Sequence, residues 1–175
     1  MDDKKKIIIE FTIDEEELAG ENEYREDLVR LGDELALGFC WMPVRFTIGD
    51  EDVFFRISPE GERLPGMSVP ILNVSYAGLN KLMSAWLFGG PVTWDVAETG
   101  RCITFNREGH EIEISTHGFG ADSPTIAADF EDLKAAFDLF ANATRNLIIS
   151  RFPEILDNPQ WEAWLRNEEG YVQDT

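Results

Sequence analysis

The sequence predicts an α+β domain in which one long helix and one or two shorter helices pack on one face of a mostly antiparallel sheet. Alternating apolar and polar residues surround glycine-containing turns at 42–57 and at 94–114, a pattern that predicts β-hairpins. The segment 129–152 has instead the period of an amphipathic helix. Strands and helices do not alternate regularly along the chain, so a parallel sheet is not expected.

The first strand is predicted over 5–13 (KKIIIEFTI), which is rich in β-branched residues. The next segment, 14–34, holds ten acidic residues against two arginines, a local net charge of −8. Three of its apolar residues recur at helical spacing: Tyr24, Leu28 and Leu31. The acidic segment is therefore either a solvated loop or a short helix over 22–31 that stops at Gly32.

A hairpin is predicted around Gly49-Asp50, because a glycine in the first turn position suits a type II′ turn. Pairing outward from this turn puts one wholly apolar face together, with the cross-strand pairs Phe46–Val53, Val44–Phe55 and Met42–Ile57. Phe54 then falls on the mostly polar face, where it is either exposed or covered by another segment.

The segment 58–70 is rich in proline and glycine and predicts an irregular connection. A brief strand is predicted over 71–74, followed by a helix over 76–88 with Ser75 as its N-cap. Gly89 and Gly90 are expected to end this helix.

A three-strand meander is predicted from turns at Thr99-Gly100 and Glu108-Gly109. Both hairpins place apolar residues on the same face of the shared middle strand: Trp94, Val96, Ile103, Phe105, Ile112 and Ile114. The pairs expected from these turns are Val96–Ile103, Trp94–Phe105, Phe105–Ile112 and Ile103–Ile114. The opposite face is polar and carries Thr104, Asn106, Glu111 and Glu113. A glycine-containing loop, 115–124, follows the meander.

The long helix is predicted over 129–152, with Asp129 as its N-cap and Pro153 ending it. Its apolar stripe consists of Phe130, Leu133, Phe137, Phe140, Ala141, Thr144, Leu147, Ile148 and Phe152. We expect Phe137 and Phe140 to pack against the apolar face of the meander. A last helix over 158–167, carrying Trp161 and Trp164, is predicted from an Asn-Pro start.

The length of 175 residues and an apolar content of 43% predict one folded domain spanning 1–175. No segment approaches the ~20 apolar residues of a membrane-spanning helix, and the N terminus lacks the apolar core of a signal peptide. We therefore expect a cytoplasmic protein with reduced thiols. Cys40 and Cys102 are expected to be small buried side chains or, alternatively, one disulfide.

The net charge is −19, from 34 acidic and 15 basic residues. A field of this sign repels nucleic acid and anionic lipid and favours basic protein partners. We therefore expect neither a direct nucleic-acid contact nor a membrane contact. The candidate partner-binding residues are the carboxylates of the acidic segment and of the polar meander face: Glu15, Glu16, Glu17, Glu21, Glu23, Glu111 and Glu113.

No motif in the sequence indicates a particular catalytic reaction or ligand. His110 and His117, with Asp122 and the meander carboxylates nearby, are too few and too irregularly spaced for a zinc site. A calcium loop, a serine nucleophile elbow and a nucleotide-binding loop are all missing from the sequence. We therefore predict no metal, no cofactor and no catalytic residue, and keep an enzyme built from scattered carboxylates, with or without a divalent metal, as the alternative.

A short, strongly acidic α+β chain without a signal peptide or a catalytic motif resembles the bacterial immunity proteins that neutralise polymorphic or contact-dependent toxins. The resemblance covers the character of the whole chain. It implies a non-enzymatic inhibitor that covers the positive site of a basic partner such as a nuclease toxin. A third hypothesis is a nucleic-acid mimic that occupies nucleic-acid-binding proteins.

Overall fold

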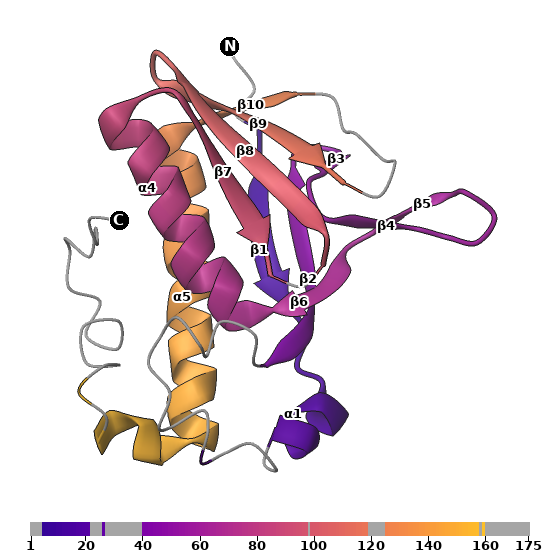
Figure 1. Cartoon of the computed structure of the whole chain (residues 1–175), viewed down its shortest axis with the longest axis vertical. Coiled ribbons are helices and arrows are strands. Elements are labelled where there is room, and N and C mark those ends of the chain that lie inside the picture. Colours follow the sequence, from indigo (N-terminus) through magenta and orange to yellow (C-terminus); the bar gives the residue numbers. More distant parts are fainter. Residues whose placement is uncertain are drawn as a thin grey trace.

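The computed structural model describes residues 5–21, 26, 40–97, 99–118, 125–157 and 159. They form two four-stranded antiparallel sheets and a two-stranded arm, with two helices, α4 and α5, along one side (Figure 1). The predicted α+β class is confirmed. Among the described residues, no helix is long and apolar enough to cross a membrane.

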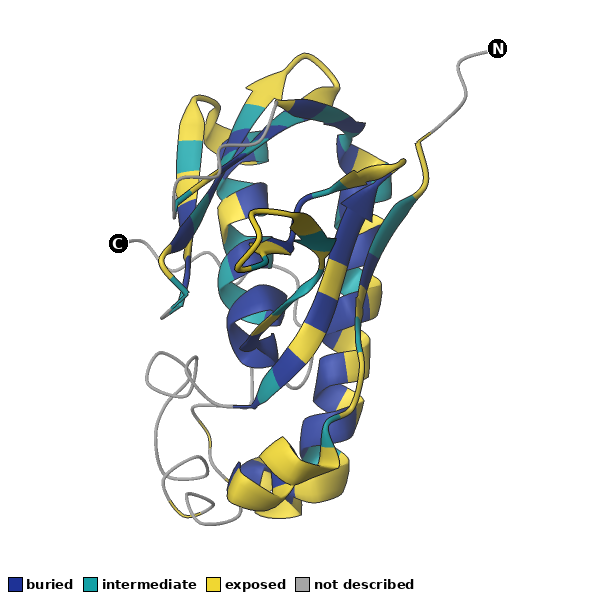
Figure 2. Cartoon of the chain, turned by 90° about the vertical axis from the view of Figure 1, so that its right-hand side faces the viewer, coloured by how far each residue is buried: buried dark blue, intermediate teal, exposed yellow. Residues whose placement is uncertain are grey.

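The first sheet is built around β2 (Trp41–Ile48). On one side β2 pairs with β1 (Ile7–Phe11), and on the other with β3 (Glu51–Asp52) and β6 (Met67–Pro70). Alternate residues of β2 are buried and exposed over its first six positions (Figure 2), so one face of this sheet meets the core and the other meets solvent.

The second sheet has the strand order β10-β9-β8-β7. It consists of β7 (Pro91–Val96), β8 (Arg101–Glu108), β9 (Glu111–His117) and β10 (Ile126–Asp129). Its inner face buries the predicted apolar residues of the meander, which are Trp94, Val96, Ile103, Phe105, Ile112 and Ile114.

The arm consists of β4 (Phe55–Ile57) and β5 (Arg63–Pro65), which pair only with each other among the described strands. It projects away from the two sheets (Figure 1). The helical elements are α1 (Glu15–Glu21), the π-helix η2 (Asn73–Gly78), α4 (Leu79–Phe88), α5 (Phe130–Arg151) and the 3₁₀-helix η3 (Pro153–Asp157).

The long helix α5 begins and ends where the sequence predicts. The Asp129 side chain accepts a hydrogen bond of 3.1 Å from the Asp132 N–H, which satisfies an otherwise unpaired first-turn donor. Phe152 is its C-cap, and Pro153 starts η3. The predicted apolar stripe is buried along its whole length.

Phe137 is the point where α5 meets both sheets. Its ring packs edge-on against Phe46 of β2 at 5.7 Å, Phe105 of β8 at 6.3 Å and, at 6.2 Å, Trp94 of β7. The prediction that Phe137 packs on the meander is confirmed, and the first sheet shares the contact. Phe140 is buried as predicted, but its ring contact is with Phe11 of β1, at 5.4 Å.

The π-helical turn η2 lies close to this aromatic cluster. A Cβ atom on Gly78 would lie 3.0 Å from both the Phe137 and the Trp94 rings, so a larger residue there would require these rings to shift by a few tenths of an ångström. The buried Asn73 accepts a hydrogen bond of 2.9 Å from the Trp94 indole N–H. These contacts hold the start of the α4 region against β7.

The predicted hairpin at Gly49-Asp50 is correct only next to its turn. Thr47 pairs with Asp52, but the amides of Val53 and Phe54 then both donate to the Phe46 carbonyl, at 2.8 and 3.2 Å. Two residues thus oppose one, as in a β-bulge. The chain bends there and buries both side chains in the core.

Beyond this bend, the predicted pairs Val44–Phe55 and Met42–Ile57 are wrong. The partner of β2 over this stretch is β6, with Val44 opposite Met67 and Met42 opposite Val69. The segment predicted to be irregular, 58–70, therefore supplies both β5 and β6. The strand predicted over 71–74 is also wrong, because Asn73 and Val74 begin η2.

The meander keeps its predicted faces but changes its register. Trp94 lies opposite Ile103, and Phe105 opposite Ile114, so each pair is shifted by two residues from the prediction. A shift of two leaves every side chain on its original face, because the side-chain period of a strand is two. The wider turn after Val96 is stabilised by Thr99, whose hydroxyl donates to the Val96 carbonyl at 2.7 Å.

Other predictions are settled only in part. Cys40 and Cys102 are both free, so the alternative of a disulfide is wrong. The helix over 76–88 is confirmed for its larger part as α4, but Ser75 does not cap it, since its hydroxyl donates to the Leu72 carbonyl. The short helix over 22–31 and the last helix over 158–167 lie, apart from single positions, outside the described residues.

Replacing Phe137 by Ala should lower the free energy of unfolding by about 3–5 kcal/mol, because the change opens a cavity where three other rings now make contact. Leu139→Ala is the matched control, since Leu139 lies on the same helix and is 71% exposed. The control should change stability by no more than about 0.5 kcal/mol. Urea unfolding measures both, and equal effects would contradict this account of the core.

Candidate partner-binding surface

The outer face of the second sheet is polar from edge to edge. Residues that alternate with the buried ones point away from the core and are exposed or half-buried. They are Thr93, Asp95, Cys102, Thr104, Asn106, Glu108, Glu111, Glu113, Ser115 and His117, with Ala127 and Asp129 on β10. We call this surface the acidic face.

The carboxylates of the acidic face are brought together by strand register. Glu111 of β9 lies directly opposite Glu108 of β8 on one side and Asp129 of β10 on the other. Cross-strand neighbours of this kind have Cβ atoms roughly 5 Å apart, so three carboxylates form a row across three strands. Glu113 follows two residues after Glu111 and therefore points from the same face.

The surroundings leave this row strongly negative. None of the outward positions that the structure describes on β7, β8, β9 and β10 carries Lys or Arg. Two described cations lie next to these strands: Lys5, whose ammonium group donates to the Ala127 carbonyl on β10, and Arg107 of β8, which precedes Glu108 and donates to the Gly109 carbonyl in the turn. The Asn106 amide donates to Glu108 at 3.2 Å, and the Asp129 side chain caps α5. The sequence predicted Glu111 and Glu113 on this face, and the structure places both of them there.

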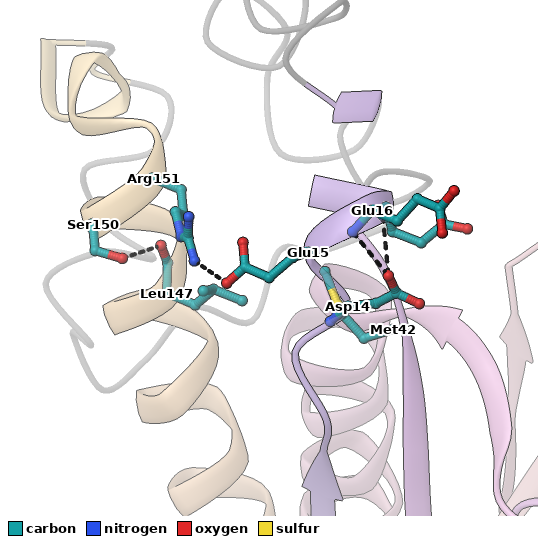
Figure 3. A network of polar contacts seen from close by, with 8 residues as sticks. Asp14, Glu15, Glu16, Met42, Leu147, Ser150 and Arg151 are labelled. Atoms are coloured by element: carbon teal, nitrogen blue, oxygen red, sulfur yellow. Dashed lines mark hydrogen bonds and ion pairs between the residues drawn. The ribbon is translucent and has the colours of Figure 1, made fainter. Parts of the chain in front are cut away.

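The carboxylates of α1 are used differently (Figure 3). Asp14 accepts hydrogen bonds from the amides of Glu16 and Glu17, at 3.0 and 3.2 Å, and so caps the helix. Glu15 forms an ion pair with Arg151 at the end of α5. Glu16 and Glu17 are exposed, whereas Glu15 is already engaged in joining two elements of the fold.

Glu21, another predicted partner-binding residue, is 8% exposed and faces inward. Its carboxylate accepts a hydrogen bond of 2.8 Å from the amide of Cys40, a buried residue with a positive φ of 59°. Burial raises the pKa of Glu21, and the nearby charge of Glu17 raises it further, while the Cys40 hydrogen bond partly opposes both. Glu21 thus connects the end of α1 to Cys40 and is not exposed on the surface, where a partner could contact it. Glu23 lies outside the described residues.

The two groups of predicted carboxylates are not brought together. Figure 1 shows α1 at the opposite end of the molecule from the turn between β8 and β9. A single partner of ordinary size would not contact both groups through one compact patch. The acidic face is the larger and more regular of the two, and we take it as the candidate site.

The histidines do not form a metal site with these carboxylates. His110 lies in the turn before β9, and His117 is the last residue of that strand, so they are separated by about 20 Å of extended chain. No group of three or more potential ligands occurs among the described residues, and Asp122 lies outside them. The predicted position of His117 in a loop is corrected to the end of a strand.

The molecule also has a concave site that the sequence did not indicate. A groove of about 620 Å³ lies between the arm and the outer face of the first sheet. Its charged residues are Glu10, Arg45 and Arg56. Of the acidic residues predicted to bind a partner, those that the structure describes do not line this groove.

Comparison of this chain with models of protein families, with curated proteins and with solved structures found no match.

Glu21→Gln provides a test of the buried carboxylate. The substitution keeps an oxygen that can accept from the Cys40 amide but removes the ionisable group. Because the folded-state pKa of Glu21 is raised above its ordinary 4.5, its contribution to stability is complete below that value and is lost as the pH rises through the folded pKa. The free energy of unfolding of the variant, relative to wild type, should therefore increase as the pH rises from 4.5 through the raised folded-state pKa of Glu21.

Urea unfolding across this pH range measures the difference. Glu16→Gln is the control, since Glu16 lies on the same helix and is exposed. Its difference from wild type should not depend on pH. A Glu21→Gln difference that is equally flat would show that Glu21 is hydrated in solution.

Proposed function

We propose that this chain is a non-enzymatic acidic binding protein that inhibits a basic protein partner, of the kind that an immunity protein forms with a nuclease toxin. The observation that carries the proposal is the acidic face. Glu108, Glu111, Glu113 and Asp129 lie on one sheet surface whose outward positions carry no Lys or Arg in the described strands.

The shape of the acidic face supports binding of a protein surface. An enzyme built from carboxylates needs a few of them to converge in an apolar pocket, where their pKa values are shifted. Glu108, Glu111 and Glu113 instead lie along neighbouring strands of a pleated sheet. Such a row matches a partner that presents several lysine or arginine side chains on a broad surface.

Electrostatics would then act at two ranges. The net charge of −19 draws a basic partner toward the molecule from a distance and raises the association rate. At contact, carboxylates accept charge-assisted hydrogen bonds from guanidinium and ammonium groups, and arginine can bind two oxygens at once. The same field disfavours direct binding of nucleic acid, whose phosphates carry the same sign.

The size of the acidic face indicates what else the partner would touch. Four strands of about six residues span roughly 20 Å by 20 Å, a projected area of about 400 Å². A standard interface buries about 800 Å² on each partner. The additional surface would come from elements next to the acidic face. The first turn of α5 is the natural candidate, because it follows Asp129 directly and carries Glu131 and Asp132.

The proposal predicts that neutralising the acidic face slows association. The triple variant Glu108→Gln, Glu111→Gln, Glu113→Gln should associate about tenfold more slowly at low salt with the basic protein captured on the immobilised wild-type chain. The wild-type rate should itself fall as the ionic strength rises, because the Debye length shrinks from about 30 Å at 0.01 M to about 8 Å at 0.15 M. The dissociation rate should respond much less to salt.

The matched control is Glu51→Gln, Glu60→Gln, Glu62→Gln, which removes the same charge from exposed positions of β3 and the arm. Its association rate should fall only slightly and its dissociation rate should not change. Surface-binding kinetics at several salt concentrations measure both variants. Equal slowing in the two variants would show that the acidic face is not the contact surface. A captured partner that is itself acidic would overturn the proposed function.

A further inference from the structure

The groove under the arm is formed by the first sheet and by the arm. Its floor is the solvent-facing side of the first sheet, where Arg45 lies opposite Glu10 and Ser68 lies opposite Pro43. Its wall is the arm, which contributes Arg56 from β4. In Figure 1 the arm projects away from the first sheet, and in the view of Figure 2 it points toward the viewer.

The arm that forms this wall is stabilised by contacts of Phe55 with two arginines, Arg63 of the arm itself and Arg101 of β8. The guanidinium groups of Arg63 and Arg101 lie 3.8 and 4.3 Å from the centre of the Phe55 ring. Arg101 also donates to the Phe55 carbonyl at 3.2 Å, and Phe55 itself is buried. Cation–π contacts of desolvated groups are stronger than those at exposed sites. The base of the arm is therefore anchored to β8.

The far end of the arm is also ordered by its own residues. The Ser58 hydroxyl accepts hydrogen bonds from the amides of Glu60 and Glu62, at 3.2 and 3.1 Å. At the base, the Gly66 amide donates to the Phe54 carbonyl at 2.8 Å. A preformed wall lowers the entropy that a ligand must overcome on binding.

The polar groups of the groove are suited to an anion. Arg45 and Arg56 supply two guanidinium groups, each a planar fork that matches the oxygens of a phosphate or a carboxylate. Thr12 and Ser68 add two hydroxyl groups. Among the described residues, Glu10 is the only carboxylate that lines the groove, and its oxygen is 3.7 Å from Arg45. Both side chains of this pair are more than half exposed, so the ion pair is weak and an incoming anion can replace it.

We propose that this groove binds a small organic anion through a phosphate or carboxylate group. The volume of about 620 Å³ is within the range of small-molecule sites. Arg45 and Arg56 hold the anionic group, Thr12 and Ser68 donate to its oxygens, and Pro43 and Met67 contact its apolar part. The site is independent of the proposed function, since it lies on the other sheet and has the opposite local charge.

The test is a titration of the full chain with inorganic phosphate, pyrophosphate or citrate at constant ionic strength, followed by backbone amide shifts in NMR. Binding should be saturable, with the largest shifts in β2, β4 and β6. Saturation by phosphate or pyrophosphate alone would assign a phosphate ligand, and saturation by citrate alone a carboxylate ligand. Shifts that spread over the whole chain without saturation would overturn the proposal.

Four variants make the test specific. Arg45→Gln and Arg56→Gln should each weaken binding by about tenfold, since each removes a charge-assisted pair of hydrogen bonds. Lys81→Gln removes one positive charge from an exposed position of α4, outside the groove, and should bind as wild type does. Glu10→Gln should bind more tightly, because it removes the negative charge of the groove and releases Arg45.

The gain of affinity in Glu10→Gln is a result that loss of folding cannot produce. Equal affinities in wild type, Arg45→Gln and Arg56→Gln would overturn the assignment of the groove. Failure of the groove would leave the proposal for the acidic face intact, because none of these substitutions touches that face.

Discussion

Burial of the Phe137 ring is the constraint on which the rest of the fold depends. One side chain of α5 contacts Phe46 of the first sheet together with Trp94 and Phe105 of the second. The backbone at Gly78 lies close to this cluster, where a Cβ atom would come to 3.0 Å from the Phe137 and Trp94 rings. Both sheets must therefore turn their apolar faces toward the same helix, which determines where their polar faces point.

The two outward faces that result differ in charge. The second sheet presents carboxylates in a row across β8, β9 and β10, and the first sheet presents a groove with two arginines. A net charge of −19 suggests a uniformly acidic surface, yet the fold separates an acidic face from a local cationic site. With this separation, the two proposed partners, a basic protein and a small anion, would bind on different sides of the protein.

Part of the candidate site could be predicted from the sequence. Glu111 and Glu113 alternate with buried isoleucines, so their place on the outer face follows from the strand period alone. Glu108 joins them only because the turn has a different register from the one predicted. Glu21 is buried against Cys40, 19 residues away, and Arg56 lines a groove because the base of the arm lies beside the outer face of the first sheet. No local pattern carries such long-range contacts.

The sequence by itself determined the features that depend on neighbours along the chain. Asp129 and Pro153 set the ends of α5, and alternation set the faces of the meander, because caps and side-chain periods act within a few residues. Only the tertiary structure decided the register of the meander and the partner of β2 beyond Asp52. A register shift of two residues leaves each side chain on the same face of the sheet, so the alternation of apolar residues does not distinguish the two registers. The hairpin pattern likewise leaves Phe54 either exposed or covered, and its burial depends on ring contacts with Phe46 and Trp94. Those alternatives differ in free energy only through contacts between segments that are distant in sequence.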